Sequence, residues 1–287
     1  MKLGILPAHL HCCPGMPRTP TATTHPERPL AWAAAWAARL LRVQHEPAAI
    51  SVLHQALGSL APLSNFIVFE FALDRQPELI DCNYERDYML AQMAQYRHGL
   101  YLLDPFWRTV VEGRAGLVRM EDIAPEDFRQ SEYFQRHYKA TGVVDELRYV
   151  VPLQPGRSVH VFVEREAPLS VFEAEELHRF DDVEPLVRAF IEAHVIWRDR
   201  QHLQATPPRP AFDLRVQIHA MQPGEITPRE TDIIEMMLKG HSAKSMSSAL
   251  DIEEGTVTNH KRNIYAKIGI HSQAQLFDRF LRTLTSH

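Results

Sequence analysis

The sequence is poor in cysteine and in long apolar runs. Its 287 residues contain only Cys12, Cys13 and Cys82, an odd number without a paired spacing, which predicts reduced thiols rather than a disulfide framework. No apolar run approaches the ~20 residues of a transmembrane helix, and prolines break up the apolar residues near the N-terminus, which argues against a signal-peptide core. We therefore expect a cytoplasmic protein without a membrane segment.

Motifs of catalysis are missing as well. The sequence has no Gly-rich phosphate loop, no nucleophile elbow, no paired-carboxylate motif and none of the acidic cluster of a receiver domain. His9, His11, Cys12 and Cys13 are potential metal ligands, but they are crowded together and lack the separated pairs of a zinc site. We predict no catalytic residues, no cofactor and no metal, and hence a protein that is not an enzyme.

The composition, with 45 % hydrophobic and 23 % charged residues, is that of a globular chain. The formal net charge of −5 speaks against nucleic acid only as an average. Residues 226–287 carry +1 and the remainder −6, and residues 256–268 contain three cations and no anion. A locally basic helix is what docking on DNA phosphates requires, although a solvated helix face would show the same charges.

Proline content and apolar periodicity divide the chain into four segments. The segments are a proline-rich flexible tail over 1–30, a sensor-type α/β domain over 31–198, a linker over 199–225 and a helical domain over 226–287. Within the linker, residues 212–221 fit a short helix and a short strand equally well.

Helices flanking a small antiparallel sheet are expected in the second segment. Helices are predicted over 32–43, 50–60, 84–103 and 172–195, the last opened by a capping box at Ser170 and Glu173 and interrupted at Pro185, and strands over 66–71, 148–153 and 158–163. The turn Gln154–Arg157, with Pro155 and Gly156, joins the last two strands. This pattern predicts an α+β fold.

The last sixty or so residues carry clear helix boundaries. Thr227, Pro228 and Glu230 form a helix start with a capping box, and Gly240 ends that helix. Ser242 caps a second helix, and Gly269 ends a third before a fourth begins near residue 272. Four short helices with a tight turn between the second and third predict an all-α helix-turn-helix domain.

Three runs of this domain resemble the LuxR/GerE helix-turn-helix: Ile226–Glu230, Gly240–Lys244 and Gly255–Gly269. The resemblance implies a dimeric, sequence-specific bacterial transcription regulator whose third helix enters the major groove. The residues that we expect at the DNA are Lys244, Thr256, Val257, Asn259, His260, Lys261 and Arg262. For Val257, packing in the core is an equal alternative to contact with a thymine methyl group.

Three departures from the family pattern weaken the expected DNA affinity. Ser245–Ser247 replaces the usual Glu-Ile-Ala, Thr258 replaces a lysine, and Glu253 replaces the serine that usually caps the third helix. The apolar positions are kept, so the fold of the domain is expected to be unchanged.

The second segment resembles the autoinducer receptors of the same family. Tyr101–Phe106 is similar to their Asp-Pro segment, whose aspartate receives the ligand's amide hydrogen, and Ser131–Phe134, Tyr138 and Gly142 with the strand pair resemble their αβα sandwich. The upstream Trp and Tyr of those receptors would fall on Ala91 and Gln95 here. The resemblance therefore implies a regulator that senses a molecule other than an acyl-homoserine lactone.

Carboxylates among aromatic residues favour an amine or another cationic ligand, through ion pairing and cation–π attraction. A quorum-type signal is the other ligand class considered. The candidate ligand-binding residues are Tyr96, Tyr101, Asp104, Phe106, Tyr133, Tyr138 and Glu146. The competing interpretations are that Asp104 caps a following helix and that Asp145 and Glu146 lie in a solvated loop.

The sequence thus predicts an N-terminal αβα sensor joined to a C-terminal four-helix DNA-binding domain. The expected partners are double-stranded promoter DNA, a small-molecule effector, a second copy of the chain and RNA polymerase. The alternative is a non-enzymatic signal-binding or dimerisation module with a weakened DNA-binding domain.

Overall fold

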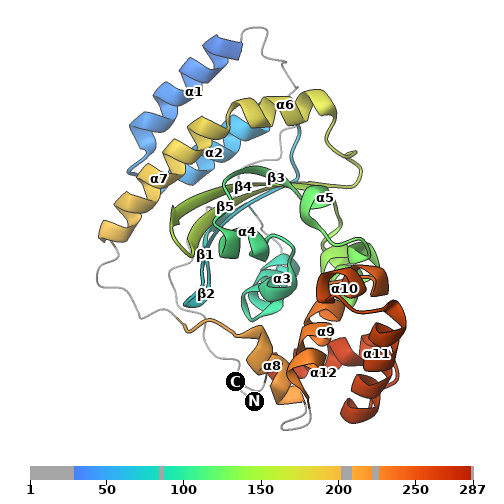
Figure 1. Cartoon of the computed structure of the whole chain (residues 1–287). Helices are drawn as coiled ribbons and strands as arrows, with labels where there is room; N and C mark the ends of the chain where they lie inside the picture. Colours follow the sequence, from blue (N-terminus) through green and yellow to red (C-terminus); the bar gives the residue numbers. More distant parts are fainter. Residues whose placement is uncertain (1–28, 84–86, 202–208, 222–225, 286–287) are drawn as a thin grey trace.

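The computed structural model describes residues 29–83, 87–201, 209–221 and 226–285, and the predicted tail lies almost wholly outside these ranges. A five-stranded antiparallel sheet forms the centre of the N-terminal domain (Figure 1). Its strands are β1 (Asn65–Ala72), β2 (Arg75–Cys82), β3 (Gly116–Arg119), β4 (Val143–Gln154) and β5 (Arg157–Glu166), in the order β2-β1-β5-β4-β3. The predicted strand pair is confirmed as β4 and β5, while β2 and β3 were not predicted.

Side chains alternate between the two faces of the sheet and so divide the core. On β1, Phe66 and Val68 belong to one apolar cluster and Ile67 and Phe69 to another. On β4, Leu147, Tyr149 and Val151 face the first cluster, so the residues that alternate with them, Glu146, Arg148 and Val150, point to the opposite face. This alternation places two charged side chains of β4 on one face of the sheet.

Helices cover the first face of the sheet (Figure 1): α1 (Pro29–Val43), α2 (Ala49–Gly58), α6 (Ala174–Asp182) and α7 (Glu184–Gln201). The chain breaks between α6 and α7 just before Pro185, as predicted. The predicted capping box is wrong in position. It is formed by Glu173 and Glu176, because α6 begins at Ala174, beyond the reach of Ser170.

The second face carries shorter elements: α3 (Asp87–Arg97), η1 (Leu100–Leu103), α4 (Trp107–Glu112), α5 (Met120–Ile123), η2 (Phe128–Gln130), η3 (Phe134–Tyr138) and η4 (Lys139–Thr141). The helix predicted over 84–103 is therefore two elements. Gly99, with φ of +116°, separates them, a backbone conformation that favours glycine.

The C-terminal domain contains the four predicted helices, α9 (Pro228–Leu238), α10 (Ala243–Leu250), α11 (Glu254–Ile268) and α12 (Gln273–Thr285). Thr227 and Glu230 form the predicted capping box, and the Ser242 hydroxyl accepts the Ser245 N–H. The undecided segment of the linker is helical. This helix, α8 (Leu214–Met221), packs against α9 and α12.

The two domains share one apolar cluster. It runs from the α3 face of the sheet, through Tyr101 and Phe128, to Ile218, Met237 and Leu284 of the helical domain. The helical domain therefore packs directly on the second face of the sensor (Figure 1). Of the helices described, none is long and apolar enough to cross a membrane.

Candidate functional site

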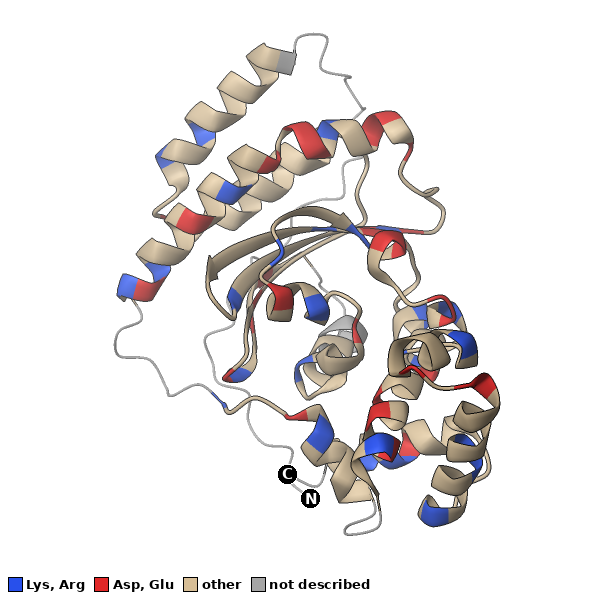
Figure 2. Ribbon diagram, in the orientation of Figure 1, with Lys and Arg blue, Asp and Glu red and all other residues tan. Residues whose placement is uncertain are grey.

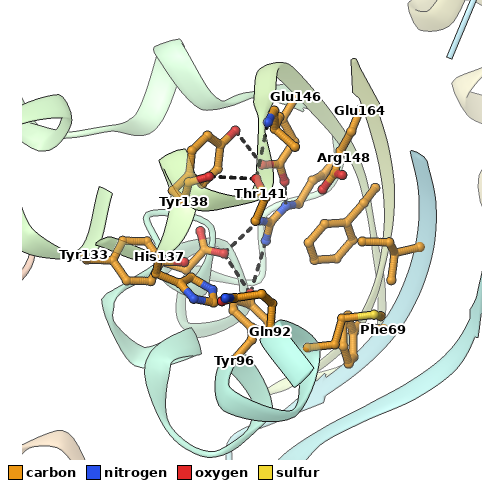
Figure 3. A pocket seen from close by; sticks show the side chains of 15 residues that line it. Phe69, Gln92, Tyr96, Tyr133, His137, Tyr138, Thr141, Glu146, Arg148 and Glu164 are labelled. Atoms are coloured by element: carbon orange, nitrogen blue, oxygen red, sulfur yellow. Dashed lines mark hydrogen bonds and ion pairs between the residues drawn. The ribbon is translucent and has the colours of Figure 1, made fainter. Parts of the chain in front are cut away.

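A cluster of charged and aromatic side chains surrounds a cavity of about 60 Å³ between the sheet and α3 (Figure 3). The sheet contributes Phe69, Glu146, Arg148, Phe162 and Glu164, and the helical side contributes Gln92, Met93, Tyr96, Asp104, Tyr133, His137 and Tyr138. The alternation of β4 explains why Glu146 and Arg148 meet here. Several of the residues that the sequence analysis proposed for a ligand line this cavity.

Arg148 lies in the middle of this cluster. Its Nη2 is 2.7 Å from Asp104 Oδ2, and its Nε donates to Glu146. Its guanidinium carbon is 3.8 Å from the centre of the Phe106 ring and 3.7 Å from that of Phe162. Burial alone would lower the pKa of Arg148, but the charges of Asp104 and Glu146 raise it well above the usual value. The guanidinium is therefore a fixed cation between two carboxylates and two rings.

Two tyrosines complete the coordination of these carboxylates. The Tyr96 hydroxyl donates to Asp104 Oδ2 at 2.7 Å, and the Tyr138 hydroxyl donates to Glu146 Oε2 at 2.8 Å. Burial raises the pKa of both phenols well above 10.0, so both remain donors at neutral pH. Burial also raises the pKa of Glu146, although Arg148 opposes this effect. Charge and hydrogen bonds hold the polar wall of the cavity in place.

Other polar atoms of the wall have no such partner. Gln92 Oε1 and His137 Nδ1 are buried and have no hydrogen-bond partner among the described residues. Burial lowers the pKa of His137 to about 4, so its imidazole is neutral at neutral pH. These two atoms therefore offer hydrogen-bonding capacity that no group in the described part of the chain uses.

Five of the seven candidate ligand residues line the cavity: Tyr96, Asp104, Tyr133, Tyr138 and Glu146. Phe106 lies behind Arg148, on the far side of its guanidinium. Tyr101 does not line the cavity, which corrects the prediction. It packs edge-on against Trp107, with its hydroxyl accepting the Phe212 N–H at 3.3 Å, because its side chain is directed toward the segment that leads into α8.

The structure decides between the alternatives for Asp104, Asp145 and Glu146. Asp104 does cap the turn after it, since its Oδ1 accepts the Phe106 N–H at 2.9 Å, and its Oδ2 faces the cavity cluster as well. Asp145 points to the other face of the sheet and pairs with Arg119 at 2.8 Å. Glu146 is not in a solvated loop, since it is 1 % exposed and lies within β4.

The reasoning from sequence missed Gln92, His137, Arg148 and Glu164. A signal existed for Arg148, because it lies two residues after Glu146 in a predicted strand region and so shares its face. Gln92 and His137 are single polar residues in helical segments, and their position in the cavity depends on how those segments pack on the sheet.

A second site is the outward side of α11, at the end of the molecule away from the sheet (Figure 2). Lys244, Asn259 and Arg262 are exposed, while Thr256, His260 and Lys261 are half-buried. Of the two alternatives for Val257, the structure shows packing in the core, because its side chain is fully buried in the apolar cluster, and this corrects its place among the residues expected at the DNA. Glu253 occupies the N-cap of α11 without a side-chain hydrogen bond to the helix.

Helices α10 and α11, with their cations, lie in a four-helix domain beside an α/β domain that contains a polar cavity. This arrangement is that of a helix-turn-helix regulator with an attached sensor-type domain. The model of the bacterial regulatory proteins of the luxR family matches residues 225–280. The crystal structure of the VqsR LBD domain from Pseudomonas aeruginosa is similar to this chain, with 30 % identity and a TM-score of 0.51, over 58 % of this chain and 98 % of that one. The chain belongs to the LuxR family.

Two sequence relatives agree with this assignment. A protein of Aeromonas salmonicida, described as an HTH-type transcriptional regulator in the exeN 3′ region, is 29 % identical over 188 residues, which are 63 % of this chain and 94 % of the relative. The monoamine regulon transcriptional regulator of Klebsiella aerogenes is 24 % identical over 246 residues, which are 84 % of this chain and 93 % of that protein. The chain is a LuxR-type transcriptional regulator with an autoinducer-binding-like domain.

Proposed function

We propose that a small cationic molecule bound in the cavity controls DNA binding by the C-terminal domain. One observation carries this proposal: the segment 128–138 forms part of the cavity wall and also the surface on which the DNA-binding domain packs. Tyr133, His137 and Tyr138 line the cavity. Phe128 and Arg136, from the same segment, contact the DNA-binding domain.

The contacts on the DNA-binding side are close. A Cβ atom at Gly240 would lie 2.9 Å from Phe128 Cα, so the backbone after α9 rests directly on η2. Arg136 Nη1 is 2.6 Å from Asp278 Oδ1 on α12, and the Arg136 guanidinium carbon is 5.2 Å from the centre of the Phe277 ring. Interiors are close-packed, so a ligand that displaces this wall changes the packing of α9 and α12.

The charge of the cavity supports a cationic ligand. Two carboxylates, those of Asp104 and Glu146, share the single guanidinium of Arg148. The wall is therefore acidic on balance, and a cation is the ligand that balances it. The monoamine regulon regulator named above is a relative over most of its length, which favours an amine over a lactone signal.

The regulatory step is a change in the orientation of α11 relative to the sensor. α11 lies at the edge of the helical domain away from the sheet, and Asn259 and Arg262 on it are exposed, so the packing against the sensor leaves them accessible (Figure 1). Two copies of the chain would present two such helices to half-sites ~34 Å apart, and their relative orientation decides whether both fit. In this proposal the protein acts as a homodimer on promoter DNA with RNA polymerase, and it is not an enzyme.

Quantitative gel shifts on DNA from upstream of the protein's own gene test this function. We expect specific binding that weakens steeply with salt and changes by severalfold when n-butylammonium is added as the probe cation. Asp104→Asn removes one of the two carboxylates on Arg148 and should abolish the response to the cation. Specific binding that no cation alters, in the wild type or in the variant, would contradict ligand control.

A second function is favoured by the cap of α11. Glu253 makes no side-chain hydrogen bond at the helix N-terminus, and the exposed Thr258 stands where the family has a lysine. The negative charge of Glu253 and the missing cation at Thr258 both lower the affinity of this helix for DNA phosphates. Absence of specific binding at low salt, with and without n-butylammonium, would support a signal-binding or dimerisation module instead.

A further inference from the structure

Two aromatic rings beside the acidic residues are already occupied by the protein's own cation. The Arg148 guanidinium carbon lies less than 4 Å from the ring centres of both Phe106 and Phe162. Recognition of a quaternary ammonium relies on open aromatic faces around the methyl groups. The faces of Phe106 and Phe162 that Arg148 covers are not open to a methylated cation.

The unused groups of the wall are of a different kind. Gln92 Oε1 is a buried amide oxygen, and a buried acceptor without a donor costs free energy until a donor reaches it. His137 Nδ1 is likewise buried and has no hydrogen-bond partner in the described part of the chain, and a neutral imidazole with its proton on Nε2 presents Nδ1 as a second acceptor. His137 stacks on Tyr96, and Figure 3 shows it on the same side of the cavity as Gln92.

From these two observations we infer that the ligand is an ammonium ion with N–H donors, a primary or secondary amine, and that Gln92 and His137 select for it. This inference rests on the proposed function and narrows its ligand class. A protonated amine brings two or three donors and one positive charge, which matches two unsatisfied acceptors in an acidic wall. A quaternary ammonium brings the charge without a donor.

The size of the cavity limits the rest of the ligand. With about 60 Å³ available and ~10–15 Å³ needed for one water, the cavity as it stands accepts only a few heavy atoms. The head group of a small amine fits this space. Tyr133 and Tyr138, which line this space, belong to the segment that also contacts the DNA-binding domain.

The requirement for N–H donors can be tested by comparing the binding of two isomeric cations. n-Butylammonium and tetramethylammonium have the same atoms and the same charge, and only the first has N–H donors. Titration calorimetry of the full-length protein with each chloride salt should give at least about tenfold tighter binding of n-butylammonium, the effect of one charge-assisted hydrogen bond. Equal or tighter binding of tetramethylammonium would overturn the inference and leave control by a cation intact.

Variants assign the effect to the named residues. Gln92→Met keeps the length of the side chain and removes the acceptor, so the preference for n-butylammonium should fall by about tenfold. Gln217→Met is the matched control, because Gln217 Oε1 on α8 is also buried and unpartnered among the described residues but does not line the cavity. Loss of preference in the control alone, or in neither variant, would contradict the assignment to Gln92. Failure of both cations to bind would overturn the proposed ligand class together with this inference.

Discussion

Arg136 on η3 and Asp278 on α12 are joined across the boundary between the sensor and the DNA-binding domain, with 2.6 Å between Nη1 and Oδ1. The next residue, His137, lies in the wall of the cavity. Adjacent side chains of a single helical turn therefore contact the DNA-binding domain and the candidate ligand site. This relationship connects the candidate ligand site directly with the DNA-binding domain.

Arg136→Ala should reduce the effect of the ligand on DNA binding. The ion pair is half-exposed and contributes at most about 1 kcal/mol. The change in DNA affinity caused by n-butylammonium should therefore be smaller in the variant than in the wild type, by a factor of up to about five. Fluorescence anisotropy on promoter DNA measures both affinities. Arg129→Ala is the control, because Arg129 pairs with Glu121 inside the sensor. An equal loss in both variants would contradict a role for the Arg136 contact.

Replacement of Gly240 by alanine should separate the two domains. Gly240 has φ of +85°, and an added Cβ would lie 2.9 Å from Phe128 Cα and 3.0 Å from Ser131 Cβ. Gly269 has a similar φ of +72° at the end of α11, with no atom within 4 Å of an added Cβ. Both substitutions cost about 1 kcal/mol of backbone strain, and Gly240→Ala adds the overlap.

Urea unfolding and small-angle scattering distinguish these two variants. Gly240→Ala should be the less stable and should have the larger radius of gyration, since the domain must shift away from η2. Gly269→Ala should keep the wild-type dimensions. Equal dimensions for the two variants would show that the contact at Phe128 does not hold the domains together.

Much of this architecture follows from local sequence signals. Caps and stops such as Thr227, Ser242 and Gly269 determine the four C-terminal helices, and the turn at Gly156 determines the hairpin of β4 and β5. β2 was missed because Pro77 and the charged residues Arg75, Glu78 and Asp81 hide its alternation at the edge of the sheet. β3 has only four residues, and its strand character depends on pairing with β4.

Of the candidate ligand site, only the acidic and aromatic residues could be predicted from the sequence. Asp104 and Glu146 were identified from chemistry and resemblance, and they do meet across Arg148. Arg148, His137 and Gln92 come from a strand, η3 and α3, and no local pattern indicates that these elements converge. The packing of the helices on the sheet brings them together, as it brings the DNA-binding domain against η2.

Lys261→Ala should weaken binding to all DNA sequences alike. Lys261 is a half-buried cation of α11 and one of the residues expected at the DNA, and loss of one phosphate contact lowers the slope of log affinity against log salt by about 1. Lys267, on the same helix, is 2.8 Å from Glu230 Oε2, so Lys267→Gln should lower stability and leave the salt slope unchanged. Anisotropy titrations over a salt series measure the slope of log affinity against log salt for each variant. A slope altered by Lys267→Gln and unaffected by Lys261→Ala would reverse the assignment of the DNA-binding face.

Acid should destabilise the sensor through Glu70. Burial alone would raise its pKa, but hydrogen bonds and charges from Arg157, Arg198 and Arg75 lower it from 4.5 to about 2. A lowered folded-state pKa stabilises the fold above the unfolded pKa, and this contribution of about 3 kcal/mol is lost as the pH falls from 4.5 toward 2. Urea unfolding at a series of pH values should show a steeper acid decline for the wild type than for Glu70→Gln. Parallel declines would contradict the shifted pKa.

The connection between the cavity and the DNA-binding domain is tested most directly by amide hydrogen exchange of the full-length protein with and without n-butylammonium. Peptides covering 128–138 and α12 should change protection together when the cation binds, and Arg136→Ala should reduce the change in α12 while leaving the change in 128–138. Changes confined to the sheet and α3, with α12 unaffected at saturating cation, would contradict the account.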